Sequence, residues 1–313
     1  TGGLCRDNSL VRRPPTPVME QSATASSGER PTDRGRRGGI DVFDSLVVAQ
    51  PIRDGRTAAV LDTLSEWGST TRGEDVRAVL PVDGVSLVSL FLDRGATGDR
   101  LRWYIELRDD SADQWDDADA TIRERSPLFS AGLDTSLEPD ATVHRDGDGG
   151  HQLVTHATHP RRQRRYSDHV GASLVVPVAG DELPIAVAMV RVPLEPGLPS
   201  RLTALATRLG NWVKRSDRVS GWLRDRTQTL EAEAMYTESL LFEPVGDRLV
   251  LHYYMETESM ERLYDAYEDS TTVEVRVSDW VMRRVFETPE KVVEYPLESD
   301  DELLVHAVDP DRP

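Results

Sequence analysis

Apolar and polar residues alternate along two strand-turn-strand stretches that lie 150 residues apart in the chain. Residues 235–256 show the pattern most clearly, with two alternating strands on either side of a turn that contains Gly246 and Asp247. Residues 85–107 repeat it, and the turn residues Gly-Asp-Arg-Leu recur there. The positions that match at this offset are 89–93 with 239–243, 104–106 with 254–256, and His156 with His306. The chain is therefore predicted to be a tandem duplication.

Each half is predicted to follow the order strand, helix, strand, strand, helix, strand. The first half contributes a strand at 43–52, a helix with one apolar face at 60–67, a hairpin at 85–107, a helix from a capping box at 111–114, and closing segments at 142–145 and 152–158 on either side of a glycine-rich turn. The second half contributes a strand at 183–193, a helix at 202–212, a hairpin at 235–256, helices at 260–267 and from Ser278, and closing segments at 292–295 and 303–308.

This order is typical of the ferredoxin-like fold, an α+β fold with both helices on one face of an antiparallel sheet. One such repeat leaves the other sheet face bare, and two repeats in one chain can cover each other. The predicted organisation is a disordered tail at 1–40, a first ferredoxin-like repeat at 41–159, a linker with an additional strand at 160–183, and a second repeat at 184–313. The tail is predicted from its Ser, Thr, Pro, Gly and Arg content, which lacks an apolar period.

The charge balance adds a prediction about the environment. The chain has 37 basic and 55 acidic residues, and only Lys214 and Lys291 are lysines. Residues 41–313 hold 30 of the basic and 51 of the acidic residues, a net charge of −21. Concentrated salt screens the repulsion within such a surface, so the protein is predicted to be halophilic. The alternative is an ordinary acidic protein with a codon bias towards arginine.

The same charge argues against nucleic acid and acidic membranes as partners, because both are bound by basic residues. No apolar run has the length of a transmembrane helix, and no charged start followed by an apolar segment suggests export, so the cytoplasm is the expected location. The single Cys5 cannot form a disulfide within the chain. The chain is expected to be a monomer whose two halves form an internal pseudo-dimer.

Strand alternation sorts the hairpin side chains into two faces and defines a candidate site. In the second half, His252, Tyr254 and Glu256 share the face opposite Leu251 and Met255. Histidine and glutamate carry protons and tyrosine can orient or donate, so a set that recurs in both halves suits acid–base chemistry or ligand binding. The ligand-binding candidates are Tyr104, Glu106, His156, His252, Tyr254, Glu256 and His306. The alternative is a polar or water-filled sheet face preserved by duplication alone.

Other motifs point to turns and linkers. The histidines at 151, 156 and 159 do not share one strand face, so no metal site is expected. The aspartates of segment 146–150 lack the remaining ligands of a calcium loop and are predicted to form a turn. The basic segment 160–165 is expected to be a solvated linker, with docking of an acidic partner as the alternative. Because no phosphate loop, dinucleotide fingerprint or nucleophile elbow is present, no cofactor is expected.

The second half also resembles a known family over residues 184–290. The residues that carry the resemblance are Met-Tyr-Thr-Glu-Ser at 235–239 and Tyr-Tyr-Met-Glu at 253–256, and the first half has Trp-Tyr-Ile-Glu in place of the latter. This segment is similar to an uncharacterised family of small proteins from salt-loving archaea. The resemblance implies the dimeric α+β barrel, here as a pseudo-dimer within one chain. The wider superfamily includes cofactor-free monooxygenases, haem-handling enzymes, isomerases and ligand-sensing domains.

Three functions follow as alternatives. The first is a small-molecule-binding or regulatory α+β barrel without catalysis. The second is a cofactor-independent enzyme of the monooxygenase or isomerase kind, and the third is a structural or interaction module. An enzyme or a sensor needs a cavity between the sheets, whereas a structural module would fill that space with side chains. Fold analogy alone does not choose among them.

Overall fold

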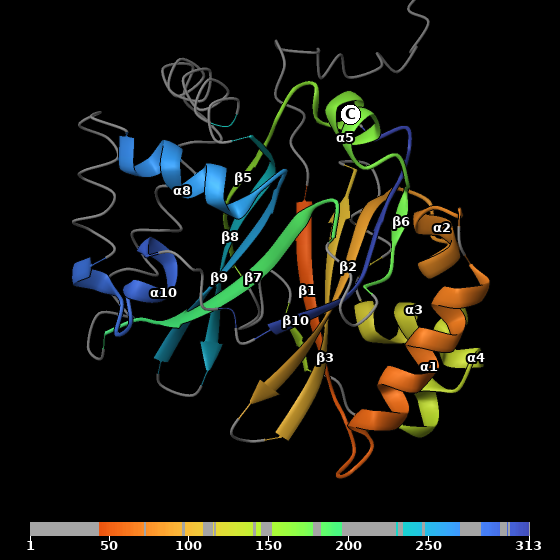
Figure 1. Cartoon of the computed structure of the whole chain (residues 1–313). Coiled ribbons are helices and arrows are strands. Elements are labelled where there is room, and N and C mark those ends of the chain that lie inside the picture. Colours follow the sequence, from red (N-terminus) through yellow and green to blue (C-terminus); the bar gives the residue numbers. More distant parts are fainter. Residues whose placement is uncertain are drawn as a thin grey trace, which may run out of the picture. The chain divides into compact units, whose positions relative to one another are not determined.

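Two antiparallel β-sheets form the centre of the protein, and helices cover the outer face of the larger sheet (Figure 1). The structure is a computed structural model, and it describes residues 44–71, 73–95, 98–108, 115, 117–139, 142–144, 152–177, 183–195, 230, 234–245, 248–269, 283–294, 299 and 301–312. The predicted tail at 1–40, the capping box at 111–114, the turn at 146–150, the helix at 202–212 and the helix start at Ser278 lie outside these residues.

The larger sheet has six strands in the order β4-β1-β3-β2-β10-β6. Its strands are β1 (Asp44–Pro51), β2 (Val85–Gly95), β3 (Gly98–Leu107), β4 (Thr142–His144), β6 (Leu174–Val175) and β10 (Asp301–Val308). The smaller sheet has four strands in the order β5-β8-β9-β7. Its strands are β5 (Gln152–Thr158), β7 (Ala186–Pro193), β8 (Met235–Val245) and β9 (Arg248–Thr257). Both predicted hairpins are therefore present, and so are the predicted strands other than the one expected at 292–295.

The last strand of each half of the chain pairs with the hairpin of the other half, an arrangement that we call strand exchange. β5 belongs to the first half of the chain but pairs with β8, and β10 belongs to the second half but pairs with β2. In consequence β4 and β5, predicted to flank a shared turn, lie in different sheets, because β4 pairs with β1. Two pairs of strands from different sheets lie next to each other, β7 with β10 and β1 with β5. Each sheet thus contains strands from both halves of the chain.

Side-chain patterning explains the layers on the larger sheet. Helix α1 (Thr57–Thr70) buries Val60, Leu64 and Trp67, which recur at helical spacing and pack on the outer face of the sheet. Helix α3 (Ala118–Arg125) starts at Asp117, whose side chain accepts a hydrogen bond from the Ala120 amide. Beside them lie the short helices α2 (Val76–Val79) and α4 (Pro127–Ser130) and the 3-10 turn η2 (Leu133–Thr135). Ser126 ends α3 and caps α4, whose first residue is Pro127.

Two segments differ from the sequence prediction. The basic segment that was expected to be a solvated linker forms helix α5 (Arg162–His169), and its Arg162 and Tyr166 are buried. The segment expected as a short strand at 292–295 instead contains helix α10 (Glu290–Val293). Helix α8 (Met260–Asp269) forms as predicted, and its Leu263 and Tyr264 join the apolar cluster of the smaller sheet. Both errors fall on stretches too short to show a reliable apolar period.

Candidate functional site

The inner faces of the two sheets meet in a mixed apolar and polar layer. Its apolar part draws residues from both sheets, including Phe91 and Tyr104 from the larger and Met189 and Tyr254 from the smaller. Six of the seven candidate residues lie close to one another in this layer. Five of them are fully buried at 0% exposed, and the side chain of His156 is 5% exposed. The candidates are therefore not on a solvated sheet face.

The first network of polar side chains consists of Tyr104, Ser239, His156, Glu106 and Arg162. The Tyr104 hydroxyl and the Ser239 Oγ lie 2.7 Å apart, which joins the larger sheet to the smaller one. Ser239 Oγ also lies 2.6 Å from His156 Nδ1, and His156 Nε2 lies 3.8 Å from Glu106 Oε2. Arg162 donates to both oxygens of Glu106 and, over 3.0 Å, to the Thr237 hydroxyl. The network therefore extends from phenol to guanidinium, and its longest step is the 3.8 Å between His156 and Glu106.

The second network has the same composition and consists of Tyr254, Ser89, His306, Glu256 and Arg312. The Tyr254 hydroxyl lies 3.1 Å from Ser89 Oγ, which lies 2.9 Å from His306 Nδ1. His306 Nε2 is 3.5 Å from Glu256 Oε1, and Arg312 donates to the two Glu256 oxygens over 2.6 and 3.0 Å. Each member lies 150 residues from its counterpart in the first network. Strand exchange creates both serine–histidine contacts, because these residues are directly opposite each other on the paired strands.

The two networks meet at a stacked pair of tyrosines. The rings of Tyr104 and Tyr254 lie 3.6 Å apart between centroids at an interplanar angle of 9°, and Phe91 contacts Tyr254 edge-on at 6.3 Å. Burial, followed by the neighbouring glutamate, raises the pKa of each phenol above its ordinary value, so both remain neutral. The middle of the inter-sheet layer is thus occupied by aromatic rings whose hydroxyls bond to the opposite sheet.

The two glutamates are charged despite their burial. Burial alone would raise the pKa of Glu106, but the Arg162 guanidinium and its hydrogen bonds outweigh it and lower that pKa to about 2. Burial likewise opposes ionisation of Glu256, and Arg312 together with His306 lowers its pKa below the ordinary range. Burial disfavours the charged form of Glu256, and Arg312 supplies the charge that compensates for it.

His252 lies apart from the other candidates, in a second group of charged side chains that we call the charge junction. The charge junction consists of Asp93, Arg102, Arg191, Glu243, His252 and Asp301. His252 Nε2 lies 2.6 Å from Glu243 Oε2. Burial lowers the pKa of His252 to about 4 although Glu243 opposes the shift, so this histidine is neutral at pH 7. His252 occupies the position that Arg102 occupies 150 residues earlier.

Sequence reasoning missed four members of the networks: Ser89, Ser239, Arg162 and Arg312. A signal for them was present, because each serine and each arginine has its counterpart at the same 150-residue offset. Arg162 comes from α5 and Arg312 from the segment after β10. Neither segment has a strand pattern that would assign its side chains to a face. The arginines therefore looked like ordinary surface charges.

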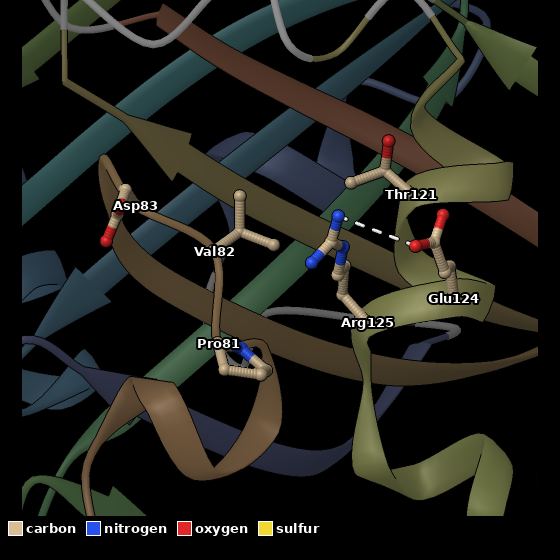
Figure 2. A pocket seen from close by; sticks show the side chains of 6 residues that line it. All are labelled: Pro81, Val82, Asp83, Thr121, Glu124 and Arg125. Atoms are coloured by element: carbon tan, nitrogen blue, oxygen red, sulfur yellow. Dashed lines mark ion pairs between the residues drawn. The ribbon is translucent and has the colours of Figure 1, made fainter.

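A shallow pocket of about 260 Å³ lies elsewhere, between α3 and the turn before β2 (Figure 2). Its lining residues are Pro81, Val82, Asp83, Thr121, Glu124 and Arg125. Glu124 and Arg125 form an ion pair of 3.4 Å across the lining, and both side chains are more than half exposed. The pocket is small for a ligand site and contains none of the candidate residues.

Two further tests for common kinds of site concern the described residues only. Within the described ranges, no group of three or more histidine, cysteine, aspartate or glutamate side chains has an arrangement that could hold a metal ion. In the same part of the chain, every helix is too short or too polar to cross a membrane.

Together, fold and site define a class: an α+β protein with two facing antiparallel sheets and paired polar networks between them. No protein-family model and no curated protein matches the chain. Two bacterial proteins provisionally named as monooxygenases are similar in structure. The one from Fusobacterium nucleatum subsp. nucleatum has a TM-score of 0.39 and 10% identity, with 85% of this chain and 92% of that chain covered. The one from Lactobacillus acidophilus has a TM-score of 0.40 and 9% identity, with 84% and 93% covered.

An anthrone oxidase-like protein is also similar, with a TM-score of 0.33, 13% identity, and coverage of 85% of this chain and 91% of that chain. The three proteins align along most of their length.

Proposed function

We propose that this chain is a structural or interaction module, the third of the functions weighed from the sequence, and not an enzyme or a sensor with its site between the sheets. The stacked pair of Tyr104 and Tyr254 carries the proposal, since the two rings are in contact and their hydroxyls bond to the opposite sheet. A ligand at this place would have to displace both rings and break both hydroxyl contacts. The candidate residues then serve to hold the sheets together.

The chemistry of the networks supports this reading. Each glutamate is neutralised by a bidentate arginine, which is an arrangement for fixing geometry more than for moving protons. Both phenols are held neutral, and both serines are fully buried, so neither can reach a substrate in solution. The small-molecule-binding function and the cofactor-independent enzyme remain the alternatives, and each would require the layer to open.

We also infer that the two halves are ferredoxin-like repeats of one ancestral unit, forming a pseudo-dimeric α+β barrel in a monomeric chain. Besides the paired networks, irregular backbone features support it. Both hairpins begin with a positive φ, 84° at Gly84 and 54° at Ala234, followed by a register shift. β5 and β10 shift register at equivalent positions, between Leu153 and Thr155 and between Leu303 and Val305. Shared bulges at a constant offset are hard to obtain from independent origins.

The test is a search for a small molecule that co-purifies with the protein. Native protein and the variant Glu256→Gln are purified side by side in high salt, and their contents are compared by mass spectrometry. The structural reading expects identical spectra without a stoichiometric ligand. A molecule that binds the native protein and is lost from the variant would overturn it. Because Glu256→Gln removes a buried charge, Tyr254→Phe, which keeps the ring, is the second variant.

A further inference from the structure

The charge junction lies at the seam where β7 meets β10. Its six side chains come from six different strands, β2, β3, β7, β8, β9 and β10, and so from both sheets. At this seam the Ser299 hydroxyl donates to the Met189 carbonyl over 2.8 Å, which ties the segment before β10 to β7. Except for Arg191, whose side chain is 20% exposed, the members of the charge junction are buried. Their charges are consequently poorly screened by solvent.

The charge junction contains more acidic than basic groups. Three carboxylates face two guanidiniums, and His252 is neutral at pH 7. Both guanidiniums converge on Asp93: Arg102 donates from Nε and Nη2 over 3.0 and 2.8 Å, and Arg191 donates to the other oxygen. Glu243 has its contact with His252, and Arg102 Nη1 lies 4.0 Å away. Among the described members of the charge junction, the carboxylates therefore outnumber the guanidiniums by one.

Asp301 is the carboxyl group with the weakest compensation. Its side chain is fully buried, and its ion pair is to Arg191 at 3.2 Å, a guanidinium that it shares with Asp93. Neither Asp301 oxygen accepts a hydrogen bond within the described residues. At the neighbouring positions along β2 and β10, Arg94 and Glu302 form an ion pair of their own with more than half of each side chain exposed. A buried carboxylate in this position is costly unless it holds a proton.

We propose that the charge junction binds one exchangeable proton at the carboxyl group of Asp301, and that release of this proton weakens the contact between the two sheets. The charges then balance while the proton is bound and leave one excess negative charge between β7 and β10 once it is lost. The junction is a pH-sensitive device built into the seam, separate from the two networks. It does not depend on the function proposed above.

The pKa of Asp301 agrees with this geometry. Burial, together with the neighbouring Asp93, raises the pKa of Asp301 to about 6 against the opposing effect of Arg191. Because the folded-state pKa lies above the ordinary value of 3.8, the contribution of Asp301 to stability is complete below pH 3.8 and is lost as the pH rises through 6. His252 acts in the opposite direction, since its pKa is lowered to about 4 and its contribution is lost as the pH falls.

The test compares the pH dependence of stability in the native protein and in Asp301→Asn, whose carboxamide imitates the protonated acid. Unfolding constants are measured with urea at constant high KCl between pH 5 and 7.5. The ratio of the native constant to the variant constant should rise about tenfold over this range. The contribution of His252 is common to both proteins and cancels in the ratio. A ratio that does not change with pH would overturn the proposal.

The matched control is Asp309→Asn, which changes an aspartate beside β10 that pairs with the part-exposed Arg108 over 2.6 Å. Its ratio to the native protein should be independent of pH. Should Asp301→Asn fail to fold, infrared spectroscopy of the native protein supplies a second measurement. The carbonyl band of a protonated carboxyl group should be present at pH 5 and disappear with a midpoint near 6, and its absence at pH 5 would overturn the proposal.

Discussion

At the scale of single residues, two arginines decide whether the inter-sheet layer can contain charge. Arg162 and Arg312 are fully buried, and each forms a bidentate pair with a fully buried glutamate. Taking an isolated carboxylate out of water is prohibitively costly, whereas a paired and hydrogen-bonded one is tolerated. Removing one partner is therefore far more damaging than the net contribution of the pair suggests.

The replacement Glu256→Gln should consequently destabilise the protein. It leaves Arg312 buried without a counter-charge, and the free energy of unfolding should fall by about 3–5 kcal/mol, measured by urea denaturation in high salt. Glu287→Gln is the control, because its partner Arg248 is half exposed, and a change within about 0.5 kcal/mol is expected there. Equal effects of the two replacements would contradict the structural role of the second network.

Residue periodicity placed the tyrosines, glutamates and histidines of the networks among the candidate residues but did not indicate their serine and arginine partners. Tyr254 and Glu256 alternate with apolar residues on one strand, so their common face could be read from the sequence. Arg312 lies 56 residues from Glu256, in a segment without periodicity, and only the fold brings the two together. His252 shares the strand face of Tyr254 but belongs to the charge junction. Successive residues on one strand face are about 7 Å apart, and this distance separates His252 from the network of Tyr254.

At the scale of elements, the strands and hairpins could be predicted, whereas the exchange of β5 and β10 could not. His156 is opposite Ser239, and His306 is opposite Ser89. With such similar halves, either closing strand would find a serine opposite its histidine in either sheet. Local pairing therefore does not distinguish the exchanged arrangement from an unexchanged one. The difference lies in contacts across the layer, which a strand pattern does not contain.

Helix α5 is the element whose role was least visible in the sequence. Its Tyr166 is 1% exposed, lies under the Arg312 guanidinium at 4.8 Å and contacts the Tyr236 ring edge-on at 5.8 Å. Tyr166→Ala should lower the free energy of unfolding by about 3–5 kcal/mol, because it leaves a cavity and removes the support of Arg312. Tyr166→Phe keeps the ring and should cost less than about 1 kcal/mol. Thermal unfolding of the two variants side by side separates them, and an Ala variant as stable as the Phe variant would exclude this packing role.

At the scale of the whole molecule, charge and salt become the main variables. The net charge of −21 on residues 41–313 opposes a stability of about 5–15 kcal/mol in dilute buffer, where repulsion is unscreened. The melting temperature should therefore climb steeply as KCl is raised from dilute to molar concentration. Sucrose at matched water activity serves as the control because it does not screen charge. Equal stability in dilute buffer and in molar KCl would remove the argument for a halophilic protein.

The exchanged strands also determine how the molecule can come apart. Separating the two sheets does not release two intact halves, because each sheet would keep a strand that is covalently continuous with the other half of the chain. Either half can separate only after β5 has lost its pairing with β8 or β10 its pairing with β2. The same step removes the histidine of one network and exposes the glutamate of that network. We therefore expect unfolding to be cooperative across both halves of the chain, and we expect deletion of either half to leave the remaining sheet with an unpaired edge.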